Sequence, residues 1–452
     1  MVELRVKTFS KELIKKIKHE KIHVISHYDT DGITSAAIIS ETLRRLSKQF
    51  SLKIVKQLNE KEIALIPKNK LIILTDLGSG HLKELSEKEN EIFIIDHHEI
   101  KNKKFEGENL NILNTHLLKK YENLCASELS YLVSREISEE NKDLAKLAII
   151  GLIGDSLGEE INKIRNNILK DAGVIVRKGF LIYPSTRPLD KALEYNPRPF
   201  IPGVSGNSKG TYELLKESGI SKIGKHYKSL IELTEKEMKA LMTNIMLRVS
   251  TKEKTSKFLG NLYLIKFFNK LEDARELSAI INACGRMGYS EVALMLCLKN
   301  LTARKKAERI YFKYRQKIVS GLKYIDKLDK SDKIIGKNYV IINAKDKIND
   351  GLIGILMSIL SFSSIYAPGT ILIGMTQDSE NESKIKISAR ISGREKSERN
   401  LKKLLEEVIE EISGENVGGH KVAAGALINK NQEKQFIDSI KRKLKFDLIK
   451  IP

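Results

Sequence analysis

The hydrophobic pattern of the first 160 residues alternates between short apolar runs and longer amphipathic stretches. Apolar, mostly β-branched runs at 22–25, 71–74 and 92–95 predict buried strands. Residues 8–20 and 33–46 repeat apolar side chains at helical spacing and predict helices. Strands and helices that alternate in this way indicate βαβ units and a parallel sheet. We therefore expect an α/β fold that begins with a parallel-sheet domain.

The pattern changes twice further along the chain. Residues 178–210 hold five of the eight prolines and predict an irregular Pro/Gly-rich insertion. Helix-forming residues then dominate, and from Gly336 onward a second α/β pattern begins. We expect an N-terminal domain over 1–230 that includes the insertion, a mostly helical connector over 231–335 and a smaller domain over 336–452.

Side chains that bind metal ions follow the predicted strands. Because the carboxyl ends of parallel strands meet at one edge of a sheet, these side chains should converge. Carboxylates and imidazoles suit manganese or magnesium, and gathered carboxylates repel one another unless cations lie between them. The alternative interpretation of the first group is an Asp/Gly turn that only caps a helix. The residues are His27, Asp29, Asp31, Asp76, Asp96, His97 and His98.

The charge balance is strongly basic. Lys and Arg total 79 and Asp and Glu total 58, which gives a formal net charge of +21. An excess of this size favours polyanionic partners such as nucleic acid. The alternative is a solvated, Lys-rich surface of the kind that heat-adapted proteins carry.

Location follows from cysteine usage and apolar length. Cys125, Cys284 and Cys297 form no C-x-x-C pair, and the N-terminus has no continuous apolar segment like that of a signal peptide. These features predict a reduced, cytoplasmic protein. Residues 351–377 carry no charge, but serines and Pro368-Gly369 interrupt them, so we expect a buried helix and a strand there and no membrane span.

Six short motifs in order resemble those of the DHH phosphoesterase superfamily. Within it, NACGR is similar to the RecJ-type motif, and the whole is most similar to archaeal RecJ-like single-strand exonucleases of the GINS-associated type. The resemblance implies a DHH domain, a smaller DHH-associated C-terminal domain and an active site in the cleft between them. The motifs are HYDTDG (27–32), LTDLG (74–78), IIDHH (94–98), GLIGD (151–155), NACGR (282–286) and GGH (418–420).

The resemblance also implies roles for individual residues. Two divalent ions would activate water, with manganese favoured over magnesium or cobalt. One ion would take His27, Asp29 and Asp76, and the other Asp31, Asp76, His97 and Asp155. The implied catalytic side chains are His98 at the scissile phosphate, Asp96 as the acceptor that orients a histidine, and Arg286. Substrate phosphates would be held by Arg390, Arg394, Gly418, Gly419 and His420.

Three functions remain open. The first is a RecJ-like exonuclease that hydrolyses single-stranded DNA or RNA, with a role in DNA repair and with replication or repair proteins as partners. The second is a phosphodiesterase for short oligonucleotides or small molecules. The third is an inactive scaffold of the replication machinery. An oligomer is compatible with all three.

Overall fold

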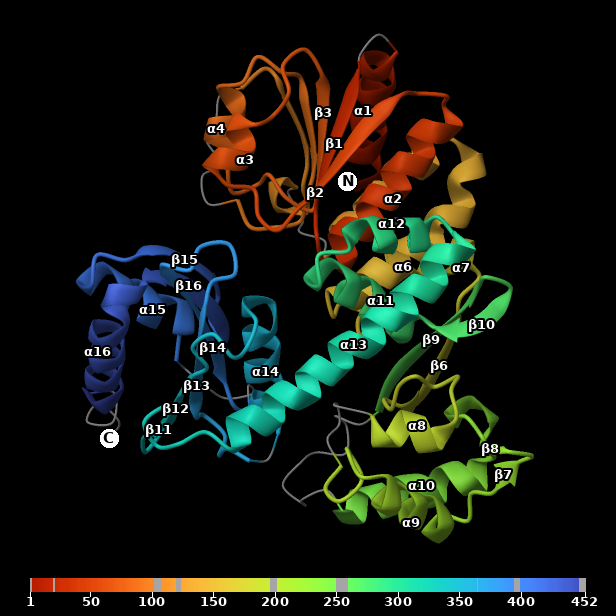
Figure 1. The fold of residues 1–452 in the computed structure, drawn as a ribbon. Coiled ribbons are helices and arrows are strands. Elements are labelled where there is room, and N and C mark those ends of the chain that lie inside the picture. Colours follow the sequence, from red (N-terminus) through yellow and green to blue (C-terminus); the bar gives the residue numbers. More distant parts are fainter. Residues whose placement is uncertain are drawn as a thin grey trace. The chain divides into compact units, whose positions relative to one another are not determined.

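The structure is a computed structural model that describes residues 2–18, 21–100, 107–118, 123–195, 201–248, 259–363, 365–393 and 399–446. Its contacts divide the chain into two compact units, Met1–Phe312 and Lys313–Pro452. The division falls inside α13 (Leu301–Asp326), which Figure 1 traces in cyan. The expected domain boundaries at residues 230 and 335 remain predictions.

The first unit begins with a five-stranded parallel sheet in the order β2-β1-β3-β4-β5. Helices α1, α2 and α5 cover one face and α3 and α4 the other (Figure 1). β3 and β4 read as continuous apolar runs because both of their faces are buried, whereas β2 and β5 at the edges of the sheet carry polar residues and are only partly buried. The elements are α1 Val2–Ile17, β1 Ile22–His27, α2 Thr30–Arg45, β2 Phe50–Val55, α3 Glu60–Ala64, β3 Leu71–Thr75, α4 Leu82–Ser86, β4 Ile92–Ile95, β5 Leu110–Leu113 and α5 Ala126–Ile137.

A helical layer packs against α2 and α5 and continues the same unit. Its core joins α6 and α7 to α11, α12 and the first turns of α13, and β9 pairs with both β6 and β10. The elements are α6 Ala145–Gly154, α7 Lys163–Ala172, β6 Ile175–Phe180, β9 Leu259–Phe267, β10 Lys270–Asp273, α11 Ala274–Arg286 and α12 Ser290–Cys297.

The Pro/Gly-rich insertion has more regular structure than the sequence predicts. Its first residues complete β6, which pairs with β9, and a helix follows where irregular chain was expected. The prediction of irregular structure over 178–210 is therefore wrong in part, because apolar side chains of the segment pack in one core with others between Leu214 and Leu262. The elements around this core are α8 Leu189–Glu194, α9 Ser208–Glu217, β7 Lys222–Ile223, β8 His226–Tyr227 and α10 Glu235–Arg248.

The second unit is a six-stranded mixed sheet in the order β11-β12-β13-β14-β16-β15. Helix α14 packs on β13 and β14, whereas α15 and α16 cover an apolar face that spans the sheet. The uncharged stretch 351–377 forms most of α14 and β13, as expected. The elements are β11 Lys333–Ile335, β12 Tyr339–Asn343, α14 Asp350–Phe362, β13 Ile371–Gln377, β14 Lys384–Ile391, α15 Leu401–Glu411, β15 Glu415–His420, β16 Ala423–Asn429 and α16 Glu433–Phe446.

Among the described residues, no helix combines the length and the apolarity that a membrane crossing needs.

Candidate metal centre

Strand order brings the predicted ligands together. β3 lies between β1 and β4, so the residues that follow these three strands meet at one edge of the sheet. Asp29 caps α2, and its Oδ1 accepts a hydrogen bond from the Gly32 amide at 3.0 Å. A Cβ on Gly32 would lie 2.4 Å from the carbonyl oxygen of His27, so this sharp strand-to-helix turn requires glycine. Asp29 therefore caps the helix through Oδ1, and its other oxygen, Oδ2, faces His27.

The first ligand group lies at the ends of β1 and β3. His27 Nδ1 is 3.1 Å from Asp29 Oδ2 and 3.2 Å from Asp76 Oδ2. Asp76 has a left-handed backbone (φ 59°) and is almost fully buried, and its amide donates to the Ile95 carbonyl. His27, Asp29 and Asp76 are close enough to hold one ion together.

The second group surrounds His97. Its Nε2 lies 3.1 Å from Asp155 Oδ2, 3.4 Å from Asp76 Oδ1 and 4.0 Å from Asp31 Oδ2. Asp31 is fully buried, and its carboxylate accepts hydrogen bonds from the amides of Ala126 (2.8 Å) and Ser127 (3.0 Å). Those amides belong to the first turn of α5, whose positive end favours a negative charge. Asp31, His97 and Asp155 are close enough to hold an ion together. Asp76 lies between the two groups, with Oδ2 beside His27 and Oδ1 beside His97.

Asp96 organises the two histidines. Its carboxylate accepts hydrogen bonds from the amides of Ser79 (2.9 Å) and His97 (2.8 Å) and is bonded to His98 Nδ1 (2.7 Å). Since Nδ1 of His98 is engaged, Nε2 is the ring nitrogen that remains for a ligand. The side chain of His98 is half exposed, so a substrate can reach it.

Burial and mutual repulsion shift the pKa values of the carboxyl groups. Burial, followed by the nearby charge of Asp31, raises the pKa of Asp155 to about 9. Burial and the charges of Asp29 and Asp31 raise the pKa of Asp76 to about 6. Burial alone would lower the pKa of His27, but Asp29 and Asp76 outweigh it and raise that pKa to about 11. The cluster therefore concentrates negative charge that needs a positive partner.

The residues present fit divalent cations. Asp76 Oδ1 and Asp155 Oδ2 are buried, and among the described residues neither has a hydrogen bond of good geometry, although His97 Nε2 lies 3.4 and 3.1 Å away. A buried carboxylate oxygen without such a bond is costly, and a cation would relieve that cost. Carboxylates and imidazoles without thiolates are the ligand set of manganese, magnesium or cobalt.

Arg286 approaches the cluster through Tyr28. Its guanidinium lies over the Tyr28 ring at 5.8 Å, and that ring contacts the His27 ring edge-on. Gly285 permits the approach, because a Cβ there would lie 1.8 Å from the Tyr28 carbonyl oxygen. The sequence assigned no role to Tyr28, although its position inside HYDTDG was a signal.

Two of the predicted substrate residues share a face of the second unit's sheet. The register aligns Arg390 of β14 with Ala423 of β16, and Ala423 with His420 of β15. Residues opposite each other in a sheet point to the same face, so Arg390 and His420 do so, separated by a small residue. Arg390 Nε also donates to Ser358 Oγ of α14 at 2.9 Å.

The paired glycines lie in the same strand as His420. Gly418 and Gly419 are exposed, and Gly419 has φ 115°, a conformation that favours glycine. Arg394 lies outside the described residues.

Sequence reasoning missed the supports of the cluster. Asn114, just after β5, donates from Nδ2 to Ser79 Oγ (2.8 Å) and to the His98 carbonyl (2.9 Å). The signal was available, since Asn114 is a polar residue that ends a strand like Asp76 and Asp96. The fully buried ion pair of Glu128 and Arg165 had no such signal, because the two residues lie 37 positions apart.

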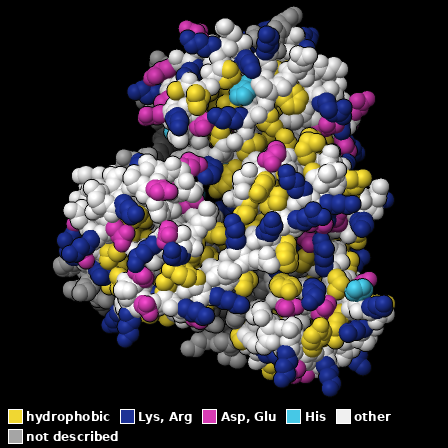
Figure 2. Space-filling view, in the orientation of Figure 1, with side chains coloured by type: hydrophobic (Ala, Val, Ile, Leu, Met, Phe, Trp, Pro, Cys, Tyr) yellow, Lys and Arg dark blue, Asp and Glu magenta, His cyan; other side chains and the backbone are white. Residues whose placement is uncertain are grey.

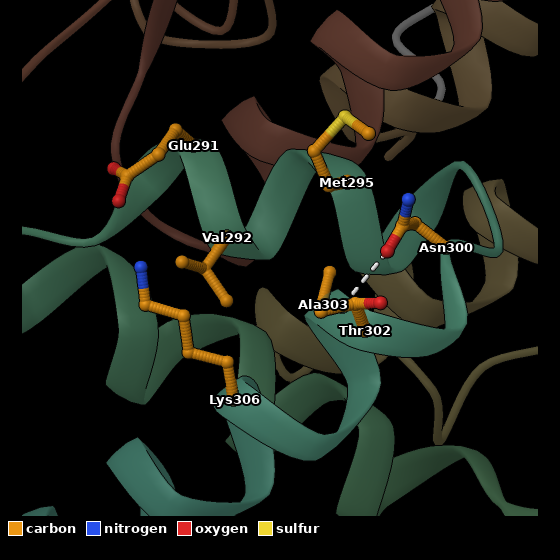
Figure 3. Close-up of a pocket in the computed structure, with 7 residues that line it drawn as sticks. All are labelled: Glu291, Val292, Met295, Asn300, Thr302, Ala303 and Lys306. Carbon is orange, nitrogen blue, oxygen red and sulfur yellow. Dashed lines mark hydrogen bonds between the residues drawn. The ribbon is translucent and has the colours of Figure 1, made fainter.

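A shallow hollow of about 320 Å³ lies between α12 and the first turn of α13 (Figure 3). Val292, Met295 and Ala303 form its apolar wall, and Glu291 and Lys306 lie at one end. None of the cluster's histidines or carboxylates lines it, so we assign it no part in the metal chemistry.

Comparison with known protein families gives three matches along the chain. Residues 21–152 match the DHH family, N-terminal domain, which includes the strand ends described above. Residues 182–262 match the DHH-CID domain, and residues 336–445 match the DHHA1 domain. The separate core of the inserted segment coincides with the second of these matches.

One curated relative and two solved structures extend over nearly the whole chain. The uncharacterized protein MJ0831 of Methanocaldococcus jannaschii is 30% identical over 433 residues, 93% of this chain and 92% of the relative. Exonuclease RecJ bound to manganese has a TM-score of 0.60 at 15% identity, covering 99% of this chain and 95% of that one. Cdc45 from Entamoeba histolytica has a TM-score of 0.64 at 12% identity, covering 96% and 98%. At these identities the two structures establish a shared fold.

Proposed function

We propose that this chain, which belongs to the DHH superfamily and is RecJ-like within it, is a metal-dependent exonuclease of single-stranded nucleic acid. The observation that carries the proposal is the meeting of His27, Asp29 and Asp76 with Asp31, His97 and Asp155 in two adjoining groups. Whether the protein is of the archaeal GINS-associated type is part of the proposal, as are replication or repair partners and a cytoplasmic location.

Each part of the cluster has a proposed task. Divalent cations held there, with manganese favoured, supply activation of water and neutralisation of phosphate charge. Asp76 directs one oxygen at each group, so it would serve both ions. Asp96 fixes the His98 ring, which would present Nε2 to the scissile phosphate. Arg286 would contact the phosphate from beside Tyr28.

The charge of the protein supports a polymeric substrate. Figure 2 shows Lys and Arg side chains over much of the visible face, among fewer Asp and Glu, and the net charge is +21. Arg390 and His420 offer phosphate contacts on the second unit. We propose that Arg390 and His420 bind phosphates of the substrate.

A second candidate is a protein of the replication machinery without hydrolytic activity. The similarity in fold to Cdc45, which is as close as the similarity to RecJ, favours it. Retention of every expected ligand position favours the exonuclease.

The test is digestion of end-labelled single-stranded DNA and RNA of graded length with manganese. We expect progressive shortening of long strands that EDTA abolishes. Cleavage of dinucleotides alone would move the assignment to a short-substrate phosphodiesterase, and no cleavage at any length would favour the inactive protein. Binding of long strands should also weaken steeply with salt, with a slope of roughly −0.7 per phosphate contacted.

A further inference from the structure

Arg165 of α7 is fully buried and uses all five of its N–H groups. Nε and Nη2 donate to the two oxygens of Glu128 at 2.8 and 2.9 Å, and Nη2 also donates to the Asn123 carbonyl at 2.7 Å. Nη1 donates to the carbonyls of Leu157 (3.2 Å) and Glu160. One side chain therefore joins three segments: the residues before α5, the first turn of α5 and the loop after α6.

Two of these segments carry a proposed metal ligand or its support. Glu128 Oε2 accepts the Cys125 amide (3.1 Å) at the start of α5, and the next two amides hold the Asp31 carboxylate. Asp155 ends α6, and the loop that Arg165 holds begins two residues later, at Leu157. A shift of Arg165 would therefore move the support of Asp31 and the loop beside Asp155 relative to each other.

We propose that the buried Arg165–Glu128 pair is a positioning unit that sets the spacing of Asp31 and Asp155, and with it the affinity of the ion site that these two residues share with His97. The inference rests on the proposed function, because it needs that site to bind a divalent ion. The other group, at His27, Asp29 and Asp76, is held by the turn at Gly32 and by contacts among its own members, so its affinity should change little.

The chemistry of the pair suits positioning better than it suits stability. A buried ion pair costs desolvation, and apolar residues of similar volume often give equal or greater stability. Apolar side chains, however, cannot bond three backbone carbonyls and a carboxylate in one fixed plane. The planar guanidinium can, and a lysine ammonium cannot, because its three N–H groups leave from a single nitrogen.

The experiment is a manganese titration of the metal-free full chain, followed by the paramagnetic resonance signal of free Mn²⁺. Arg165→Lys keeps the charge but loses the planar guanidinium. We expect it to lower the affinity for one of two bound manganese ions by about 10- to 100-fold and to leave the affinity for the other within about twofold. Glu128→Gln keeps the shape of the side chain and removes its charge. It serves as a second test because this variant should disturb the fold less. Arg135→Lys is the matched control, since Arg135 lies on α5, the helix of Glu128, and pairs with Glu139 and Asp171 instead.

The outcomes separate cleanly. Wild-type affinity for both ions in Arg165→Lys and Glu128→Gln would overturn the inference. Equal weakening of both ions, together with a lower melting temperature in EDTA, would also overturn it, because that is the result of a purely structural role. Wild-type protein that binds no manganese would remove the proposed function itself, and the inference with it.

Discussion

Gly151 of α6 lies directly against the buried carboxylate of Asp31. A Cβ on Gly151 would stand 2.7 Å from Asp31 Oδ1 and 2.1 Å from Ser127 Oγ, closer than side-chain atoms approach each other. The absence of a side chain at Gly151, the first glycine of GLIGD, therefore leaves room for the carboxylate of Asp31, the second aspartate of HYDTDG. Asp31 and Gly151 are 120 residues apart in the chain and in contact in the fold.

We expect Gly151→Ala to displace Asp31 and to lower both metal affinity and hydrolysis by at least tenfold. Overpacking a buried position also costs about 1–3 kcal/mol of stability, so unfolding by denaturant should be measured beside manganese binding. Gly80→Ala is the control, because nothing described lies within 4 Å of a Cβ there. Unaltered manganese affinity in Gly151→Ala would show that Asp31 is no ligand.

Asp76→Asn should abolish manganese-dependent hydrolysis and leave the fold intact. Asparagine tolerates the left-handed backbone of this position and matches the shape of aspartate. The substitution also removes repulsion from Asp29 and Asp31, so the metal-free variant should melt no lower than the wild type in EDTA. Activity assays and melting curves check the two parts. Appreciable cleavage by purified Asp76→Asn would contradict a role for this residue in both ion sites.

Arg390→Ala and His420→Ala should weaken substrate capture more than they slow the chemical step. Both side chains lie on the second unit's sheet and would hold phosphates rather than metal ions. Single-turnover rates over a range of enzyme concentration should show a higher half-saturation concentration with a similar maximal rate. Arg442→Ala, at an exposed pair with Glu411, controls for loss of one positive charge. An unchanged half-saturation with a collapsed rate would contradict the assignment.

Asp273 should make stability depend on pH at the start of α11. Burial would raise its pKa, but hydrogen bonds from Arg275 and Ser185 hold that pKa below the ordinary value. A depressed carboxyl pKa contributes stability above the unfolded value of about 3.9, and that stability is lost as the pH falls through the folded value. Asp273→Asn should thus cost on the order of 3 kcal/mol at pH 7.

The cost of Asp273→Asn should be similar at pH 5 and smaller at pH 3.5. Denaturant unfolding of both proteins at the three pH values measures it. A difference that grows on acidification would contradict the ion pair with Arg275.

The hydrophobic pattern predicts the parallel sheet and places the candidate metal ligands at its edge. Strands buried on both faces have to be apolar throughout, so the apolar runs 71–74 and 92–95 could be predicted as strands. The polar residues that follow them indicated the edge of the sheet. The helix and strand of the uncharged stretch 351–377 could be predicted for the same reason, because buried elements of this kind contain few charged side chains. The motifs in order identified the superfamily.

Most of the residues that support these candidate ligands follow from tertiary packing. The pairing of Arg165 with Glu128, the fit of Gly151 over Asp31 and the Arg286 contact with Tyr28 depend on helices that pack from distant parts of the chain. The same holds for the insertion, whose apolar residues share a core with residues between Leu214 and Leu262 that they meet only after folding. Periodicity reports which face of one element is buried, and it carries no information about which other element covers that face.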